Sequence, residues 1–343
     1  MIPASPLFSQ IPKSLSAPQP LRWQQLWREA ITDPLELLSQ LGLESQATEL
    51  LADADTGFAM RVPRGFVARM RHGDPNDPLL LQVLPGINEL TKTPGYFNDA
   101  VGDLDARAAP GVLHKYAGRT LLIATGSCAI NCRYCFRRHF PYAEETAASG
   151  HWRSAIDHLA TDPSINEVIL SGGDPLSLST SKLAELTDAL GKIPHVRRLR
   201  IHTRLPIVLP ERIDDEFMNW ISSLPLQRIV VLHANHANEI DESVVNACRK
   251  LDAAGVTLLN QSVLLRRIND RVEDLAALSE RLFDCGILPY YLHQLDRVQG
   301  AAHFEVSDQT AIELVDALRA RSPGYLVPRL VRETAGAASK LPL

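Results

Sequence analysis

Gly126-Ser127-Cys128-Ala129-Ile130-Asn131-Cys132-Arg133-Tyr134-Cys135-Phe136 is the stretch on which the interpretation of this chain depends, because it carries three cysteines in the spacing C-x3-C-x2-C. Three thiolates can hold three irons of a [4Fe–4S] cube and leave the fourth iron open. An open iron can bind a substrate or a cofactor. The other two cysteines, Cys248 and Cys285, lie in apolar helical patterns and are predicted to be core residues.

A structural zinc site, or three unrelated thiols, is the alternative interpretation of these cysteines. Structural zinc normally takes four Cys or His ligands, and His139 lies four residues after Cys135, where it could complete the set. However, all three cysteines lie in a polar, Arg-rich stretch directly after the apolar residues 121–124. A loop after a strand at the active face of a barrel would lie there. The pattern therefore favours an iron–sulfur cluster.

The composition limits the class of protein. The chain has 343 residues, 45% of them hydrophobic, and a formal net charge of −5, so no basic field indicates nucleic-acid binding. No apolar segment reaches the roughly 20 residues that span a bilayer. Residues 1–20 are rich in Pro and Ser and lack the apolar core of a signal peptide. Clustered cysteines of this kind suit a reducing compartment, so we expect a cytoplasmic protein without a membrane partner.

The chain divides into three segments by pattern. Residues 1–118 are predicted to form a helical N-terminal extension, in which Trp23, Leu26 and Trp27 recur at helical spacing and Asp33-Pro34 opens a second helix. Residues 119–325 alternate between apolar runs and amphipathic stretches, which indicates βαβ units, a parallel sheet and an α/β fold. Residues 326–343 form a C-terminal segment. Periodicity does not distinguish a partial barrel from a doubly wound sheet.

The alternation in the middle segment is regular. We expect strands in the apolar runs 120–125, 166–170, 197–203, 228–233, 256–264 and 287–295. We expect helices in the amphipathic stretches 151–161, 179–191, 214–223, 241–254, 271–284 and 307–321.

Polar residues near the ends of these strands are candidates for a site, because barrel enzymes bind their ligands at that rim. The second strand is followed by Ser171-Gly172-Gly173-Asp174, where glycines allow close approach of a ligand and Asp174 can accept a hydrogen bond from an ammonium group. Taken alone, this segment is an ordinary turn. His202 ends the third strand and Gln261 lies in the fifth. A lone histidine at a strand end is usually structural.

The C-terminal segment holds one lysine, Lys340, after the small residues 335–339. A terminal lysine is normally solvated. A small-residue loop can also present its amine to a carbonyl cofactor, and pyridoxal phosphate (PLP) is bound through such an amine.

Together these residues resemble the radical S-adenosylmethionine (SAM) superfamily and, within it, the PLP-dependent lysine 2,3-aminomutases, over about residues 110–343. The matching stretches are His114-Lys115-Tyr116 with Arg119, the cysteine loop, Leu170 to Asp174, Leu209 to Ile213, Asn235-His236 with Asn238 to Ile240, Asn260 to Leu265, and Gly300 with His303-Phe304. The joint pattern is more specific than any single motif. The resemblance implies a partial (βα)6 barrel, with a [4Fe–4S] cluster, SAM and PLP as cofactors.

The resemblance also implies residue roles. Lys340 would bind PLP covalently, and Arg119 would pair with its phosphate. Residues 171–174, with His202 and Gln261, would serve cofactor binding, and the methionyl amino group of SAM would lie at the 171–174 segment. Arg137 would bind the α-carboxylate of the substrate. Asp296 would receive the substrate ε-ammonium, together with Glu333, which stands where the family has an aspartate; His293 stands where it has a tyrosine.

The short length and these departures resemble a subgroup called EpmB, which makes (R)-β-lysine from L-α-lysine for the β-lysylation of translation elongation factor P. That resemblance implies L-lysine as substrate, a reductant such as flavodoxin or ferredoxin, and a functional link to elongation factor P and its lysyl ligase. The alternatives are an aminomutase for another amino acid such as glutamate, or a non-catalytic iron–sulfur binding module. Two carboxylates suit an ammonium end and disfavour glutamate.

Overall fold

The structure is a computed structural model, and it describes residues 22–51, 57–144 and 152–343. The whole Pro- and Ser-rich stretch 1–20 and the start of the helix expected from residue 151 therefore lie outside the described residues.

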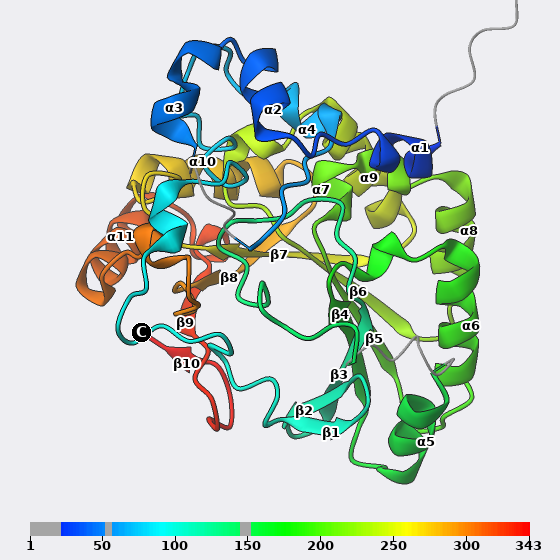
Figure 1. The fold of residues 1–343 in the computed structure, drawn as a ribbon. Coiled ribbons are helices and arrows are strands. Elements are labelled where there is room, and N and C mark those ends of the chain that lie inside the picture. Colours follow the sequence, from blue (N-terminus) through cyan, green and yellow to red (C-terminus); the bar gives the residue numbers. More distant parts are fainter. Residues whose placement is uncertain (1–21, 52–56, 145–151) are drawn as a thin grey trace, which may run out of the picture.

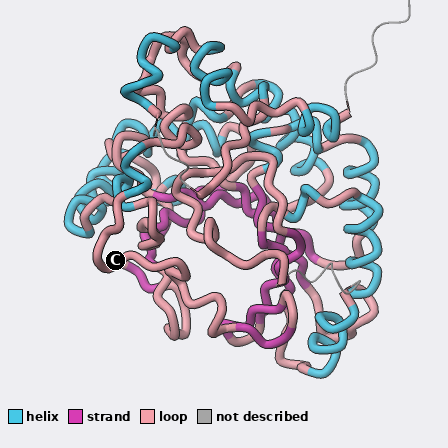
Figure 2. Tube along the Cα trace, in the orientation of Figure 1, coloured by secondary structure: helices cyan, strands magenta, loops and turns pink. Residues whose placement is uncertain are grey.

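One sheet of ten strands forms the centre of the molecule, with the strands in chain order. From β3 to β9 neighbouring strands are parallel, and β1–β2, β2–β3 and β9–β10 pair antiparallel. The sheet curls, and its end strands β1 and β10 do not pair with each other, so the described strands form an open barrel (Figures 1 and 2). The strands are β1 (Arg107–Ala109), β2 (Val112–Tyr116), β3 (Arg119–Thr125), β4 (Glu167–Gly172), β5 (Arg198–Thr203), β6 (Gln227–Leu232), β7 (Thr257–Val263), β8 (Leu288–His293), β9 (Arg329–Arg332) and β10 (Leu341–Pro342).

Helices on the outside of the sheet connect the parallel strands. Ser179, Asp214 and Asp241 each accept a backbone N–H at the start of a helix, which explains where those helices begin. The long helices are α5 (Arg153–Thr161), α6 (Thr180–Leu190), α8 (Asp215–Ser223), α9 (Glu242–Ala253), α10 (Val272–Phe283) and α11 (Asp308–Arg321), and α7 (Leu205–Val208) is a single turn. All six predicted strand–helix units are confirmed, so the fold is a partial (βα)6 barrel, and β9 adds a seventh parallel strand.

The N-terminal region contributes short helices that cover one rim of the barrel (Figure 1). They are α1 (Trp23–Arg28), α2 (Pro34–Gln40), α3 (Ala47–Leu50) and α4 (Arg64–Val67), with a 3-10 turn η2 at Ile87–Leu90. Asp33 caps α2, as the sequence predicted. Arg69 fastens the region to the barrel, since it donates to the carbonyl oxygen of Ile207 at 2.5 Å and pairs with Asp241 at 2.9 Å.

The predicted helical extension over 1–118 needs a correction, because β1 and β2 lie within it and belong to the central sheet. The turn between them contains Pro110 and Gly111, and Gly111 has a φ of 71°, which glycine adopts without strain. The three segments 1–118, 119–325 and 326–343 all contribute strands to one sheet. A division of the chain at these boundaries therefore stays a prediction.

No helix in the described ranges is long and apolar enough to cross a membrane.

Candidate active site

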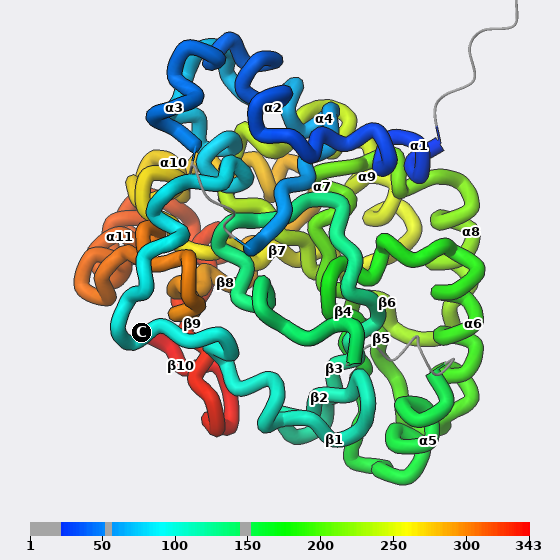
Figure 3. The backbone as a smooth tube through the Cα atoms, viewed as in Figure 1, coloured from blue at the N-terminus to red at the C-terminus, as the bar shows by residue number. Residues whose placement is uncertain are grey.

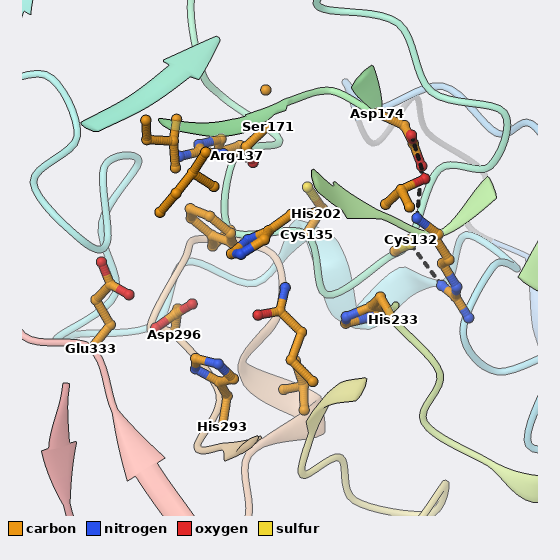
Figure 4. A pocket seen from close by; sticks show the side chains of 18 of the residues that line it. Cys132, Cys135, Arg137, Ser171, Asp174, His202, His233, His293, Asp296 and Glu333 are labelled. Atoms are coloured by element: carbon orange, nitrogen blue, oxygen red, sulfur yellow. Dashed lines mark hydrogen bonds between the residues drawn. The ribbon is translucent and has the colours of Figure 1, made fainter. Parts of the chain in front are cut away.

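A cavity of about 390 Å³ lies inside the barrel and extends to the carboxyl ends of the parallel strands. It is lined by every residue that the sequence singled out for a site: Cys128, Cys132, Cys135, Arg119, Arg137, Ser171, Gly172, Gly173, Asp174, His202, Gln261, Asp296, Glu333 and Lys340. In the close-up, Glu333, Asp296 and His293 lie together on one side, and Cys132 and Asp174 lie on the other (Figure 4). The curled sheet therefore brings together residues that are up to 221 positions apart, from Arg119 at the start of β3 to Lys340, and many of the others lie at or just beyond the carboxyl ends of strands.

The cysteine loop follows β3 and is fixed by buried ion pairs. Glu89 accepts from Arg133 Nε at 2.8 Å and from Arg138 Nη2 at 2.6 Å, so η2 of the N-terminal region holds both arginines of the loop. Burial raises the pKa of the Cys128 thiol well above its usual value and that of Cys135 to about 11. Binding of a metal cluster must therefore displace protons from these thiols.

His139 does not support the zinc alternative. It is not among the residues that line the cavity, and its Nε2 lies 3.3 Å from the carbonyl oxygen of Gln299. In the described part of the chain, no three Cys, His, Asp or Glu side chains surround a position for one metal ion. In an iron–sulfur cube each thiolate binds a different iron, so three cysteines on one loop suit that group.

Arg137 lies where the cysteine loop meets β4. Its Nε donates to Asp103 Oδ2 at 2.6 Å and its Nη1 to Ser171 Oγ at 3.0 Å. Nη2 has no hydrogen-bond partner among the described residues and remains free to bind an anion. Asp103 is buried and also pairs with Lys115 at 2.7 Å, so it fixes the guanidinium from behind.

Lys340 and the carboxylates of Glu333 and Asp296 form a second group of charges in the cavity. Lys340 Nζ donates to Glu333 Oε2, and Lys115 Nζ lies 3.2 Å from Glu333 Oε1. Burial opposes ionisation of Glu333, but the ammonium groups of Lys340 and Lys115 prevail and lower its pKa to about 2. Burial and the charge of Glu333 raise the pKa of Asp296 to about 7. One carboxylate is therefore ionised at all physiological pH values, whereas the other titrates near neutrality.

The chain resembles known proteins over nearly its whole length. Residues 117–195 match the family described as a 4Fe-4S single cluster domain. The chain is 48% identical over 332 residues to the L-lysine 2,3-aminomutase of Escherichia coli, and the match covers 96% of each chain. It is also 48% identical over 318 residues to the L-lysine 2,3-aminomutase of Haemophilus influenzae, with 93% of this chain and 94% of that one covered. The chain belongs to the L-lysine 2,3-aminomutase family.

More distant relatives of the aminomutase family also match. The L-lysine 2,3-aminomutase of Clostridium subterminale is 35% identical over 324 residues, which cover 94% of this chain and 77% of that one. Among solved structures, a radical SAM methyltransferase from Sphaerobacter thermophilus aligns with a TM-score of 0.47 at 16% identity, over 64% of this chain and 68% of that one.

Two histidines in the wall of the aminomutase cavity supply uncharged polar groups. His202 and His293 each have an Nε2 without a hydrogen-bond partner among the described residues. Burial lowers the pKa of both imidazoles well below the usual value, so both are neutral. Unpartnered buried nitrogens at a cavity wall fit a site built for a polar ligand. Arg119 lies over the ring of Tyr116 at 4.6 Å, and its cation suits a phosphate.

Asp174 differs from the expectation for this aminomutase. Its Oδ1 accepts from Leu176 N and Thr203 Oγ1, and its Oδ2 accepts from Arg204 N and Leu205 N, at 2.7–3.1 Å. Each carboxylate oxygen of Asp174 thus accepts two hydrogen bonds, which join the loop after β4 to the end of β5. No acceptor site of this carboxylate is left for an ammonium group.

Sequence analysis assigned no role to several cavity residues of this family member. Asp103, Lys115, Arg204 and His233 all line the cavity. His233 directly follows β6, and its position at a strand end was a signal that could have identified it. Asp103 lies on an irregular loop and gives no such signal.

Proposed function

We propose that the protein converts L-α-lysine to (R)-β-lysine by radical migration of the α-amino group to the β-carbon. The observation that carries this proposal is that one cavity holds a guanidinium and two carboxylates beside the cluster cysteines. Arg137 lies next to Ser171, whereas Glu333 and Asp296 lie together at another part of the wall (Figure 4). A substrate with a carboxylate at one end and an ammonium at the other matches these charges.

Arg137 is the proposed ligand of the substrate carboxylate. Asp103 and Ser171 hold its Nε and Nη1, so its remaining N–H groups are aimed before the substrate binds. A pre-aimed guanidinium loses little conformational entropy on binding, and a charge-assisted pair with a carboxylate is stronger than a neutral hydrogen bond.

Asp296 and Glu333 are the proposed ligands of the ε-ammonium group. Glu333 is ionised and already binds two ammonium groups, those of Lys115 and Lys340. Its Oε2 becomes available to the substrate when Lys340 moves to the cofactor. Asp296 has a pKa of about 7, so it can hold a proton in the empty cavity and release it when an ammonium group arrives.

The residues present fit the three cofactors of the family. Cys128, Cys132 and Cys135 would hold the cluster, the segment 171–173 with its close backbone would hold SAM, and Lys340 with Arg119 would hold PLP. When bound, the cluster with SAM supplies the radical that removes hydrogen from the substrate, and PLP supplies the conjugated system across which nitrogen migrates. The chain orients the lysine between Arg137 and Asp296.

We further propose that the β-lysine is used to modify elongation factor P through its lysyl ligase, with flavodoxin or ferredoxin as reductant. Support for this comes from the resemblance to the short subgroup. Translation takes place in the cytoplasm, and the proposal therefore assigns the protein to that compartment.

Anaerobic assay tests the proposed reaction directly. The protein is reconstituted with iron, sulfide, PLP, SAM and dithionite, L-lysine is added, and the products are separated by chiral chromatography. We expect (R)-β-lysine, and we expect none from Lys340→Ala, which keeps the cluster. If no β-lysine forms although the cluster and PLP are present, the substrate assignment is wrong.

A further inference from the structure

Arg204 has no part in the proposed function, yet it contacts a cluster cysteine. It follows β5 directly, and its side chain is 6% exposed. Its Nη1 donates to Cys132 Sγ at 2.7 Å and to Tyr134 Oη at 2.7 Å. Its Nη2 donates to Gln82 Oε1 at 2.7 Å and to Glu239 Oε2 at 2.9 Å. One guanidinium at the end of β5 thus connects the cysteine loop with two other parts of the chain, at Gln82 and Glu239.

The network around Arg204 is rigid. Glu239 is fully buried, and its Oε1 accepts from Asn235 N at 2.9 Å and Gln82 Nε2 at 3.1 Å. The backbone N–H of Arg204 donates to Asp174 at 2.7 Å, and the ring of Phe66 lies 5.5 Å from the guanidinium carbon. The guanidinium is therefore fixed at both ends and cannot turn away from the sulfur without breaking several buried hydrogen bonds.

A structural role for the ion pair with Glu239 does not account for this geometry. Such a pair needs only Nη2, which donates to Glu239. The other terminal nitrogen, Nη1, donates to Cys132 and Tyr134. The buried cation has one buried carboxylate as counter-charge, and a thiolate at Cys132 would supply a second. Buried charges are stable only when they are paired and hydrogen-bonded in this way.

We propose that Arg204 is a positioning residue for the iron–sulfur cluster, which donates a hydrogen bond to the Cys132 sulfur and raises the reduction potential of the cluster. Hydrogen bonds to the sulfurs and nearby positive charge stabilise the more negative, reduced state of a cluster. The inference rests on the proposed function in one respect, since it requires that the three cysteines bind the cluster.

A redox titration tests the proposal. The anaerobically reconstituted protein, without SAM or lysine, is reduced stepwise, and the reduced cluster is measured by electron paramagnetic resonance. We expect Arg204→Met to lower the midpoint potential by about 59 mV, which is a tenfold smaller ratio of reduced to oxidised cluster at a fixed potential for one electron. Arg204→Lys, which keeps the charge, should lie between the two. An unchanged potential in Arg204→Met overturns the proposal.

Arg69→Met is the matched control. Arg69 is equally buried and bonds to the backbone of Ile207 and Glu239, but it has no contact with a cysteine, so its loss should leave the potential unchanged. A shift as large as that of Arg204→Met would show that any lost buried cation has this effect and would overturn the proposal.

A second measurement uses the unsubstituted protein and the charge-conserving variant Arg204→Lys. In protein labelled with ¹⁵N only in arginine, pulsed electron paramagnetic resonance of the reduced cluster should show a ¹⁵N coupling that Arg204→Lys removes. If the unsubstituted protein shows no ¹⁵N coupling, the role proposed for Arg204 is wrong, whereas the proposed function is unaffected. Absence of a reduced-cluster signal would instead refute the proposed function, so the two failures are distinguishable.

Discussion

At the scale of single residues, the two carboxylates of the ammonium end have opposite properties. Glu333 stays ionised because two ammonium groups contact it, whereas the carboxylate of Asp296 has no ion-pair partner among the described residues and desolvation opposes its ionisation. The same chemical group, a carboxyl, can therefore serve as a permanent charge or as a proton carrier, depending on its neighbours.

Asp296 should make lysine binding depend on pH. Because its pKa is about 7, most of the side chain is protonated at pH 6 and ionised at pH 8, and only the ionised form attracts the ε-ammonium. We expect about tenfold tighter binding of lysine at pH 8 than at pH 6, measured as the KM of the reconstituted protein. The Asp296→Asn variant should bind weakly with a flat profile, and an equal slope in both proteins would contradict the assignment.

The raised pKa of Asp296 also makes the free energy of unfolding depend on pH. The folded protein retains a proton on Asp296 between about pH 4 and pH 7, whereas the unfolded chain releases it. The contribution of Asp296 to the free energy of unfolding therefore falls as the pH rises through that window.

At the scale of elements, the loops after β3 and β4 touch through their backbones. A Cβ on Gly173 would lie 2.5 Å from the carbonyl oxygen of Ser127, next to the first cluster cysteine. The glycine therefore serves close packing of two loops as well as any approach of a ligand.

Gly173→Ala should push the cysteine loop out of place. Overpacking of this kind costs about 1–3 kcal/mol, and the displaced thiols should bind less iron. We expect fewer irons per chain after reconstitution, measured by iron and sulfide analysis. Gly65→Ala is the control, since nothing lies within 4 Å of its added methyl group. Full iron content in Gly173→Ala would show that the two loops can move apart without loss of cluster binding.

Elements were more predictable from the sequence than the contacts between them. Every strand from β3 to β8 and its helix follows an apolar or amphipathic period, which local sequence carries. The sequence did not predict β1 and β2, because both strands are short and are stabilised by pairing: β1 pairs with β2, and β2 pairs with β3. The candidate residues all line one cavity, as expected. The sequence did not predict that Asp174 accepts a hydrogen bond from Thr203, or that Arg204 donates one to Cys132, 72 positions away. No local pattern encodes such pairings.

At the scale of the whole molecule, the N-terminal region and the C-terminal segment both close on the cavity. In the backbone view the last residues run beside the segment before β1, and a Cβ on Gly102 would lie 3.0 Å from the Cβ of Ala335 (Figure 3). Lys115 of β2 holds Glu333 from the same side. The lysine proposed to bind PLP is therefore positioned by contacts between the C-terminal segment and the residues from Gly102 to Lys115.

Glu89 should be a main support of this arrangement. It is the shared partner of Arg133 and Arg138, and all three side chains are buried. In Glu89→Gln the two arginines lose their counter-charge, and breaking a buried ion pair in this way costs about 3–5 kcal/mol. We expect a loss of that size in the free energy of unfolding, measured with urea on the protein without cofactors.

An exposed ion pair supplies the comparison for Glu89. Glu36 pairs with Arg64 at 2.5 Å with both side chains more than 40% exposed, so Glu36→Gln should cost less than about 1 kcal/mol. Because Glu89 belongs to the N-terminal region and its arginines flank the cluster cysteines, its loss should also lower the iron content, whereas Glu36→Gln should not. Equal unfolding curves for the two variants would mean that the cysteine loop is held by other contacts than this carboxylate.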